Sequence, residues 1–260
     1  MNLKILSDQH LAQFKVEFAN SLDVVIEGLD KLETPVDYFR FYNSISSVYS
    51  SKIEGEEIDF DSYFKHKFLN VHYQPDYTRK ADDLFRAYEF IFQNDLTFEN
   101  LQRAHALLSA NLLPMSQQGF IRTNPMFVLN SEDKIDYVAA EQSKLHGELA
   151  KLFADIEVLM SRELSNSEVL FFGSHIHLTF VKIHPFQDGN GRSARLMEKW
   201  FLVQKFGEKA TAIQLEKNYF LNLQAYYCNL KKLGVDYEQL DYSKAYDFFK
   251  MTANGLLSQK

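Results

Sequence analysis

The sequence contains a single cysteine, Cys228, among its 260 residues. One thiol forms neither an internal disulfide nor a cysteine-based metal cluster, so a reducing, cytoplasmic environment is expected. No apolar run approaches the roughly 20 residues that a membrane-spanning helix needs. The first residues also lack the pattern of a signal peptide, because Ser7 and Asp8 interrupt their apolar run. These absences exclude a disulfide-stapled fold and predict no membrane partner.

Glycine and proline are scarce as well, with ten and five copies. Few turn-forming residues, combined with apolar residues at three- and four-residue steps, predict a mainly α protein. Apolar residues make up 46% of the chain, which is enough for a sizeable core that would also hold most of the abundant Phe and Tyr. The net charge of −7 argues against a nucleic-acid partner, since a general phosphate-binding surface would be basic.

Two common chemical motifs are missing. The sequence has neither a GxxxxGK[ST] phosphate loop nor an HExxH zinc motif. His175 and His177 lie two positions apart in an expected helix, so they point to different faces and do not suit one metal ion. We interpret both as structural, and His105 as a packed histidine on the apolar face of its helix.

Apolar periodicity and capping residues predict the positions of the helices. Thr97 is a plausible N-cap, and Ser165 with Glu168 has the spacing of a capping box. Pro35 marks a break, and Pro75 interrupts a segment, 56–80, that we expect to hold a short helix and a loop. The expected helices cover residues 8–32, 38–53, 79–94, 98–112, 141–161, 165–183 and about 191–206.

One segment has the alternation typical of β structure. Residues 126–129 and 135–138 flank a polar turn, which predicts a hairpin. Because an isolated hairpin is only marginally stable, it would have to pack on helices. It is either a surface decoration or a free edge that pairs with an extended segment of another protein.

The densest cluster of chemical groups is HPFQDGNGRSAR, residues 184–195, between two expected helices. Gly189 and Gly191 allow the backbone N–H groups to turn inward, beside the positive end of the following helix. Arg192 and Arg195 lie three residues apart, so both guanidinium groups reach the same side. This combination suits a polyphosphate.

The same stretch supplies a metal ligand and a base. Asp188 is a hard oxygen ligand next to the phosphates, and Mg²⁺ is typically held by one or two carboxylates plus substrate phosphates. His184 has an ordinary pKa near 6.5 and could accept the proton of an attacking hydroxyl. Together these residues indicate phosphoryl chemistry.

Residues 184–195 resemble the signature of the Fic family, HxFx[DE]GNGRxxR, at each specified position. The resemblance extends from the segment Gly119–Arg122, through the hairpin and the helix that carries His177, to Tyr226 and Tyr227. It implies a small helical bundle with a β-hairpin flap. We expect an N-terminal helical region at 1–95, a Fic core at 96–235 and a C-terminal helical tail at 236–260.

The resemblance also implies an activity, the transfer of AMP from ATP with Mg²⁺ to a Tyr, Ser or Thr hydroxyl of a target protein. His184 would be the base, and Phe186 would anchor the loop. The remaining roles fall on groups of residues. The metal ligand would be Asp188; the phosphate ligands Gly189, Asn190, Gly191, Arg192 and Arg195; the base-stacking residue Tyr227; and the target-docking flap Met126, Phe127 and Val128.

A second, shorter resemblance concerns Ser50–Gly55, which is similar to the family's inhibitory motif [ST]xxxE[GN]. It implies an inhibitory helix at about 38–55, in which Ser50 and Glu54 act and Glu54 pairs with Arg195. A carboxylate at a helix C-terminus opposes the macrodipole at a cost of about 0.3–1 kcal/mol. An arginine partner would compensate that cost, and the enzyme would be autoinhibited.

The sequence departs from the family at Gly234, which lies where many members have an asparagine near the adenine. Nucleotide preference is therefore open. Two alternatives to AMP transfer also remain open, namely removal of AMP from a modified target, with Glu54 orienting water, and a nucleotide-gated module that binds a protein without durable chemistry. The oligomeric state is open as well, and dissociation of a homodimer could relieve the inhibition.

Overall fold

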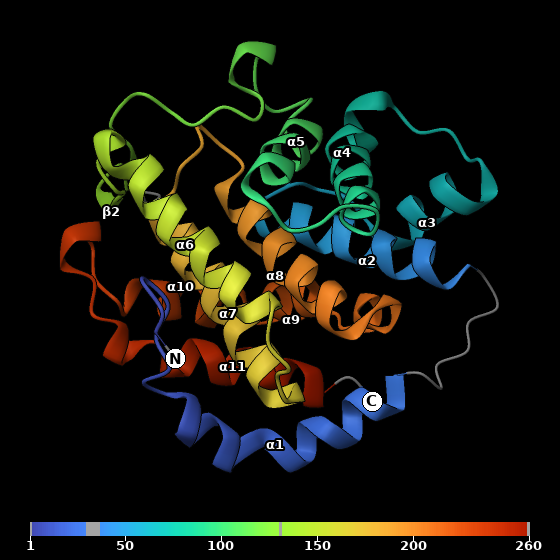
Figure 1. Ribbon diagram of the computed structural model, residues 1–260. Coiled ribbons are helices and arrows are strands. Elements are labelled where there is room, and N and C mark those ends of the chain that lie inside the picture. Colours follow the sequence, from blue (N-terminus) through green and yellow to red (C-terminus); the bar gives the residue numbers. More distant parts are fainter. Residues whose placement is uncertain (1, 30–36, 130–131, 259–260) are drawn as a thin grey trace.

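The computed structural model describes residues 2–29, 37–129 and 132–258. Over these ranges the chain forms eleven α-helices and one two-stranded antiparallel sheet (Figure 1), which confirms the mainly α prediction. The α-helices are α1 (Leu11–Gly28), α2 (Tyr38–Ile53), α3 (Phe60–Leu69), α4 (Pro75–Ile91), α5 (Phe98–Leu108), α6 (Leu145–Met160), α7 (Asn166–Ile183), α8 (Asn190–Phe206), α9 (Leu215–Leu221), α10 (Leu223–Lys231) and α11 (Tyr246–Leu257).

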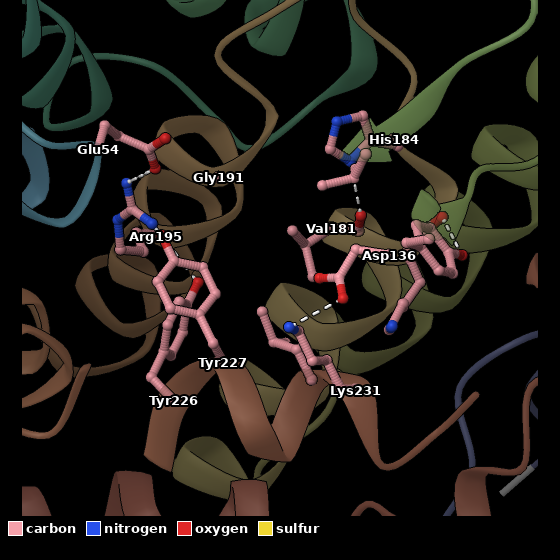
Figure 2. A pocket seen from close by; sticks show the side chains of 13 residues that line it. Glu54, Asp136, Val181, His184, Gly191, Arg195, Tyr226, Tyr227 and Lys231 are labelled. Atoms are coloured by element: carbon pink, nitrogen blue, oxygen red, sulfur yellow. Dashed lines mark hydrogen bonds and ion pairs between the residues drawn. The ribbon is translucent and has the colours of Figure 1, made fainter. Parts of the chain in front are cut away.

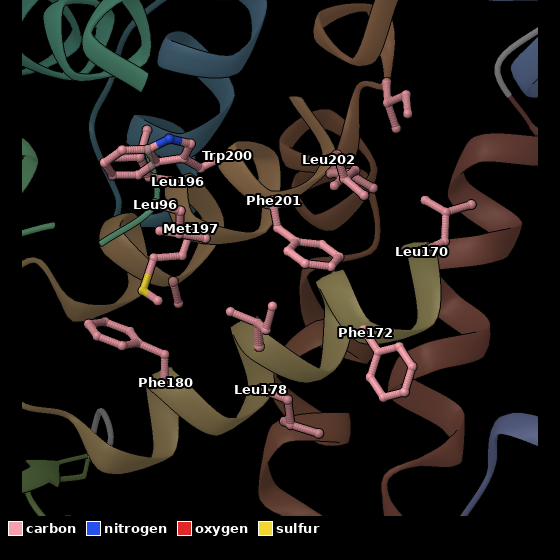
Figure 3. Close-up of a cluster of buried hydrophobic side chains, with 14 of the residues drawn as sticks. Leu96, Leu170, Phe172, Leu178, Phe180, Leu196, Met197, Trp200, Phe201 and Leu202 are labelled. Carbon is pink, nitrogen blue, oxygen red and sulfur yellow. The ribbon is translucent and has the colours of Figure 1, made fainter. Parts of the chain in front are cut away.

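Helices α7 and α8 pack against each other at the centre of the molecule, with the other helices around them (Figure 1). The predicted capping box is present at the start of α7, where Ser165 and Glu168 bond each other's backbone N–H groups. Apolar side chains of the two helices face one another, among them Phe180, Met197 and Phe201 (Figure 3). Each is fully buried, and burial of one such side chain contributes about 1.5–3 kcal/mol.

Residues 184–195, which the sequence singled out, form the turn between α7 and α8 and the start of α8. Helix α7 ends at Ile183, and His184 follows in a left-handed conformation with φ of 55°. Pro185 cannot continue the helix, and α8 starts at Asn190. The most buried helix pair of the fold thus fixes both ends of this loop.

Several helix boundaries differ from the predictions. Helix α4 begins at Pro75 instead of residue 79, because proline is well suited to the first helical position, where its missing N–H has no partner to lose. Helix α3 is the short helix expected within 56–80. Helix α1 is shorter than the expected 8–32, and the break at Pro35 lies outside the described residues.

The hairpin is present as β1 (Phe127–Leu129) and β2 (Ile135–Val138), and the first two residues of its turn lie outside the described ranges. Its two strands are antiparallel, with Phe127 opposite Val138. The N–H of Val138 donates to the carbonyl of Val235 at 2.8 Å, which attaches β2 to the segment after α10. In the part of the chain described, no helix is long and apolar enough to cross a membrane.

Candidate active site

A cavity of about 220 Å³ opens beside the loop between α7 and α8 (Figure 2). Helices α7, α8 and α10, the hairpin and the residue that follows α2 all contribute to it. Its lining residues are Glu54, Val128, Asp136, Tyr137, Val181, Lys182, His184, Gly191, Arg195, Tyr226, Tyr227, Leu230 and Lys231.

The imidazole of His184 is held in one orientation at the wall of the cavity. Its Nδ1 lies 3.1 Å from the carbonyl oxygen of Val181. Because a carbonyl only accepts, Nδ1 carries the proton, and Nε2 of the neutral ring is left as an acceptor. Burial lowers the pKa of His184 below its ordinary 6.5, so the ring is neutral at pH 7. The geometry therefore provides a base.

A second histidine, His105, packs against the loop between α7 and α8. The ring of His105 stacks on Phe186 with centroids 3.7 Å apart. Its Nδ1 accepts from the N–H of Gly119 at 2.8 Å, so its Nε2–H donates to the carbonyl of Asp188 at 2.9 Å. Burial lowers the pKa of His105 to about 4, and the ring stays neutral. His105 is packed, as predicted, and it also positions the loop.

The amide of Asn190 closes the loop internally. Its Oδ1 accepts from the N–H of Phe186 at 2.8 Å, and its Nδ2 donates to the carbonyl of the same residue at 2.9 Å. The side chain is thus engaged within the loop, and phosphate contacts from this position would come from the backbone N–H. Phe186 is fully buried, in line with the anchoring role that the resemblance implies.

Arg122 ties His184 to the base of the hairpin. Its Nε donates to the carbonyl of His184 at 2.8 Å, and its Nη groups donate to the carbonyls of Asn124 at 2.6 Å and Ala140 at 2.5 Å. The side chain is 4% exposed. These bonds to carbonyls hold His184 in its left-handed conformation, which a non-glycine residue adopts only when its surroundings require it.

Glu54 and Arg195 form an ion pair at the cavity wall, with the Nη2 of Arg195 2.6 Å from a carboxylate oxygen of Glu54 (Figure 2). Ser50 adds two bonds, because its hydroxyl accepts from Arg195 Nε at 3.0 Å and its carbonyl accepts from Nη2 at 3.2 Å. Burial raises the pKa of Glu54. The positive charges of Arg195 and Arg192 lower it by a larger amount, so the net shift is downward. The carboxylate is ionised at neutral pH.

Arg192 has a partner from the same segment that the sequence did not suggest. Its Nη2 lies 3.4 Å from a carboxylate oxygen of Glu56, and Lys80 contacts that oxygen at 2.6 Å. The Nε of Arg192 is buried and has no hydrogen-bond partner among the described residues. A buried donor without an acceptor costs free energy, and an anion bound here would supply one.

The two glycines of the loop have different reasons to be glycine. Gly189 has φ of 78°, which side chains with a Cβ rarely adopt. Gly191 lies in α8, and a Cβ there would stand 2.6 Å from a carboxylate oxygen of Glu54 and 3.2 Å from Nη1 of Arg195. Gly191 therefore leaves room for a group at the N-terminus of α8, a space that Glu54 occupies in this structure.

Asp188 is the single acidic side chain of the loop. It is exposed, and one of its carboxylate oxygens accepts from the N–H of Gly189 at 2.6 Å. Within the described ranges, no group of three His, Cys, Asp or Glu side chains converges on one point. A lone carboxylate next to an anion site fits a cation such as Mg²⁺ that is also held by substrate phosphates.

The two tyrosines of α10 face the site differently. Tyr226 is buried, its hydroxyl 3.0 Å from Nε2 of His177 and 3.4 Å from Nη1 of Arg195. His177 also contacts Glu198 at 2.6 Å, which confirms that this histidine is structural. Tyr227 is 39% exposed, and its hydroxyl donates to the carbonyl of Ile53 at 3.1 Å, next to Glu54.

The structure brings many of the predicted site residues to one cavity. His184, Gly191, Arg195, Tyr227, Glu54 and Val128 line it, and Ser50 bonds Arg195. The other predicted site residues are not among the lining residues, namely Met126, Phe127, Asp188, Gly189, Asn190 and Arg192. Phe127 is 49% exposed on the outer part of the hairpin. Sequence reasoning did not foresee the contacts of Glu56, Arg122 and Lys182, or the bond from His105 to the loop, because these contacts join distant segments. The only local indication was that Glu56 directly follows the inhibitory motif, two residues after Glu54.

Residues 95–202 match the model of the Fic/DOC family. The fold agrees with solved structures of that kind. A Fic family protein from Desulfovibrio desulfuricans G20 superimposes with a TM-score of 0.76 at 21% identity, and the match covers 94% of this chain and 72% of that one.

Two further structures extend the comparison. A Fic domain containing signaling protein from Bacteroides thetaiotaomicron VPI-5482 gives a TM-score of 0.69 at 16% identity, covering 92% of each chain. Fic-1 from C. elegans gives 0.67 at 13% identity, covering 95% of this chain and 71% of that one. At these identities the likeness shows the fold alone, and a comparison with curated proteins found no significant match.

Proposed function

We propose that this protein transfers AMP from ATP to a Tyr, Ser or Thr hydroxyl of a target protein, and that Glu54 inhibits it by occupying Arg195. The observation that carries the proposal is the convergence of His184, Gly191 at the N-terminus of α8 and the buried Arg195 on one cavity, with a second buried arginine, Arg192, one residue after Gly191. Arg192 is 4% and Arg195 1% exposed, yet an acidic residue of one segment pairs with each of them. Buried arginines at a helix N-terminus suit phosphate oxygens.

The chemistry follows from this placement. The target hydroxyl oxygen attacks the α-phosphorus of ATP, its proton passes to Nε2 of His184, and the bond to the β-phosphate breaks with release of pyrophosphate. Asp188, with phosphate oxygens, would hold Mg²⁺, which supplies positive charge to the leaving pyrophosphate. Arg192 and Arg195 bind the outer phosphates and stabilise the charge that develops on them.

Glu54 supports the autoinhibition half of the proposal. Its carboxylate holds the arginine that would bind the outermost phosphate, and it fills the space beside Gly191 at the start of α8. A bound triphosphate and the Glu54 carboxylate would compete for the same guanidinium and repel each other.

The hairpin supports a docking role for the target. Among the described residues, β1 pairs only with β2, so the outer edge of β1 is available for strand addition. Val128 of β1 faces the cavity while Phe127 is exposed. A target segment paired along residues 126–128 would therefore pass close to His184.

Labelling with ATP tests the proposal. We expect Glu54→Gly to increase the transfer of label from α-³²P-ATP to protein, and Glu54→Gly/His184→Ala to abolish it. Label transferred from the γ position would indicate a kinase-type reaction instead and would refute nucleotidyl transfer. Equal labelling by wild type and Glu54→Gly would refute autoinhibition.

Removal of AMP from a modified target is the second candidate function. It is favoured by the position of the Glu54 carboxylate, which lines the same cavity as His184 and could orient a water molecule. Rapid release of AMP from a pre-modified target by wild type, but not by Glu54→Gly, would support removal over transfer.

A further inference from the structure

Lys182 is a buried cation in the cavity that the proposed phosphoryl chemistry does not use. It lies in the last turn of α7, two residues before His184, and is 5% exposed. Its ammonium stands 4.1 Å from the ring centroid of Tyr137. Within the described residues it has no hydrogen-bond acceptor, although an ammonium carries three donors.

The surroundings hold this ammonium in place. The hydroxyl of Tyr137 donates to the backbone carbonyl of Lys182 at 2.7 Å, which fixes the ring beneath the side chain. Asp136, the preceding residue of β2, forms an ion pair with Lys231 of α10 at 2.9 Å. Burial lowers the pKa of Lys182 to about 8, and Asp136 opposes this shift. A cation–π contact only partly replaces the hydration that burial removes.

The end of the cavity that holds Lys182, near the hairpin, differs from the end that holds Arg195 and suits phosphates. Figure 2 shows Glu54 and Arg195 on one side, Asp136 and Lys231 on the other, and Tyr227 between them. The walls near the hairpin are otherwise apolar or aromatic, with Val128, Val181, Leu230 and the half-exposed ring of Tyr227. Flat apolar walls with a hydrogen-bond donor at one end suit a planar ring that carries acceptor atoms.

We infer that Lys182 contacts the nucleobase, donating a hydrogen bond from its ammonium to an acceptor atom at the edge of the ring, while Tyr227 stacks on the ring face. This inference rests on the proposed function, because it takes the phosphates to lie at Arg192 and Arg195. Asp136, beside Lys182, is placed to accept from an N–H group of the same base. Lys182 is then a determinant of nucleotide selectivity.

Comparing MgATP with Mg-tripolyphosphate, which has the phosphates but no base, tests this role. Two full-chain proteins are compared, Glu54→Gly and Glu54→Gly/Lys182→Met. Calorimetry measures the affinity of each for MgATP and for Mg-tripolyphosphate. Methionine keeps the unbranched apolar stem, and the bond from Tyr137 is to the backbone carbonyl, so the hairpin stays attached. The matched control is Lys232→Met, since Lys232 pairs with Asp247 outside the cavity.

We expect Lys182→Met to weaken MgATP binding by about tenfold or more, the range for a hydrogen bond to a charged group, and to leave tripolyphosphate binding unchanged. It should also reduce the differences in affinity among ATP, GTP and UTP. An equal loss for ATP and tripolyphosphate, or no loss for either, would overturn the inference while the proposed function stands. Failure of the Glu54→Gly protein to bind either ligand would overturn both.

Discussion

Replacement of Glu54 by glycine is expected to raise the apparent affinity for MgATP by about 10- to 30-fold. Arg195 donates to Glu54 at 2.6 Å, and Glu54 retains 27% side-chain exposure. A hydrogen bond between charged groups contributes about 1.5–3 kcal/mol. Because Glu54 is partly solvated, we take the lower half of that range, about 1.5–2 kcal/mol. The apparent dissociation constant scales inversely with the fraction of molecules whose Arg195 is free, so this energy appears directly in the affinity.

Isothermal titration of MgATP at pH 7 and fixed ionic strength measures the effect. Glu57→Gly is the matched control, since Glu57 is exposed and outside the cavity. Glu54→Gln separates charge from shape, because glutamine fills the space beside Gly191 without the charge. We expect an intermediate affinity for glutamine if the ion pair inhibits binding, and wild-type affinity if shape alone inhibits it. A folded Glu54→Gly protein that binds MgATP no more tightly than wild type would refute the reasoning.

Two further predictions concern neighbouring groups. Adding Glu56→Gln to Glu54→Gly should raise MgATP affinity by no more than a few-fold, because the contact of Glu56 with Arg192 is long, at 3.4 Å, and such pairs contribute about 0–1 kcal/mol. The same titration measures this change in affinity. A lower affinity than that of Glu54→Gly alone would contradict the idea that Glu56 holds Arg192 away from the phosphates. Burial lowers the pKa of both His105 and His175 to about 4 in the folded protein. Because the unfolded chain binds these protons near pH 6.5, stability should be constant above that pH and fall between pH 6.5 and 4, by up to about 3 kcal/mol for each histidine. Urea unfolding at pH 7.5, 6 and 5 measures this fall, and an unfolding free energy that stays level over this range would contradict it.

The loop between α7 and α8 could be predicted closely because its determinants are local. Pro185 ends one helix, the capping geometry at Gly189 starts the next, and the chemical side chains lie between them. The ion pair between Glu54 and Arg195 was expected from resemblance and is present in the structure. Physical reasoning from the sequence supplied only a weaker statement, that a carboxylate at a helix end needs a partner.

The residues that sequence reasoning missed act across the fold. Glu56 reaches Arg192 over 136 positions, and Arg122 reaches His184 over 62. Apolar periodicity gives the buried face of a helix but not which residue of another helix lies opposite, so such pairs cannot be read from the pattern. Pro75 illustrates a local ambiguity, since proline both interrupts a helix and starts one, and only the neighbouring packing decides between the two.

The way in which α2 is anchored limits how the proposed inhibition can be relieved. Glu216 of α9 accepts from Ser46 of α2 at 3.0 Å and from Tyr88 of α4 at 2.8 Å. Helix α2 also buries apolar side chains, each 8% exposed or less, namely Tyr42, Ile45, Val48 and Ile53.

Undocking α2 would expose these four side chains at about 1.5–3 kcal/mol each and leave Glu216 without its serine partner. Glu54, by contrast, lies one residue beyond the end of the helix and is followed by Gly55, whose φ of 86° already turns the chain away. Rotating the Glu54 side chain breaks its bond to Arg195, a loss of about 1.5–3 kcal/mol. The cheaper route is therefore local, with ATP phosphates or a small shift after Ile53 displacing the carboxylate while α2 stays in place.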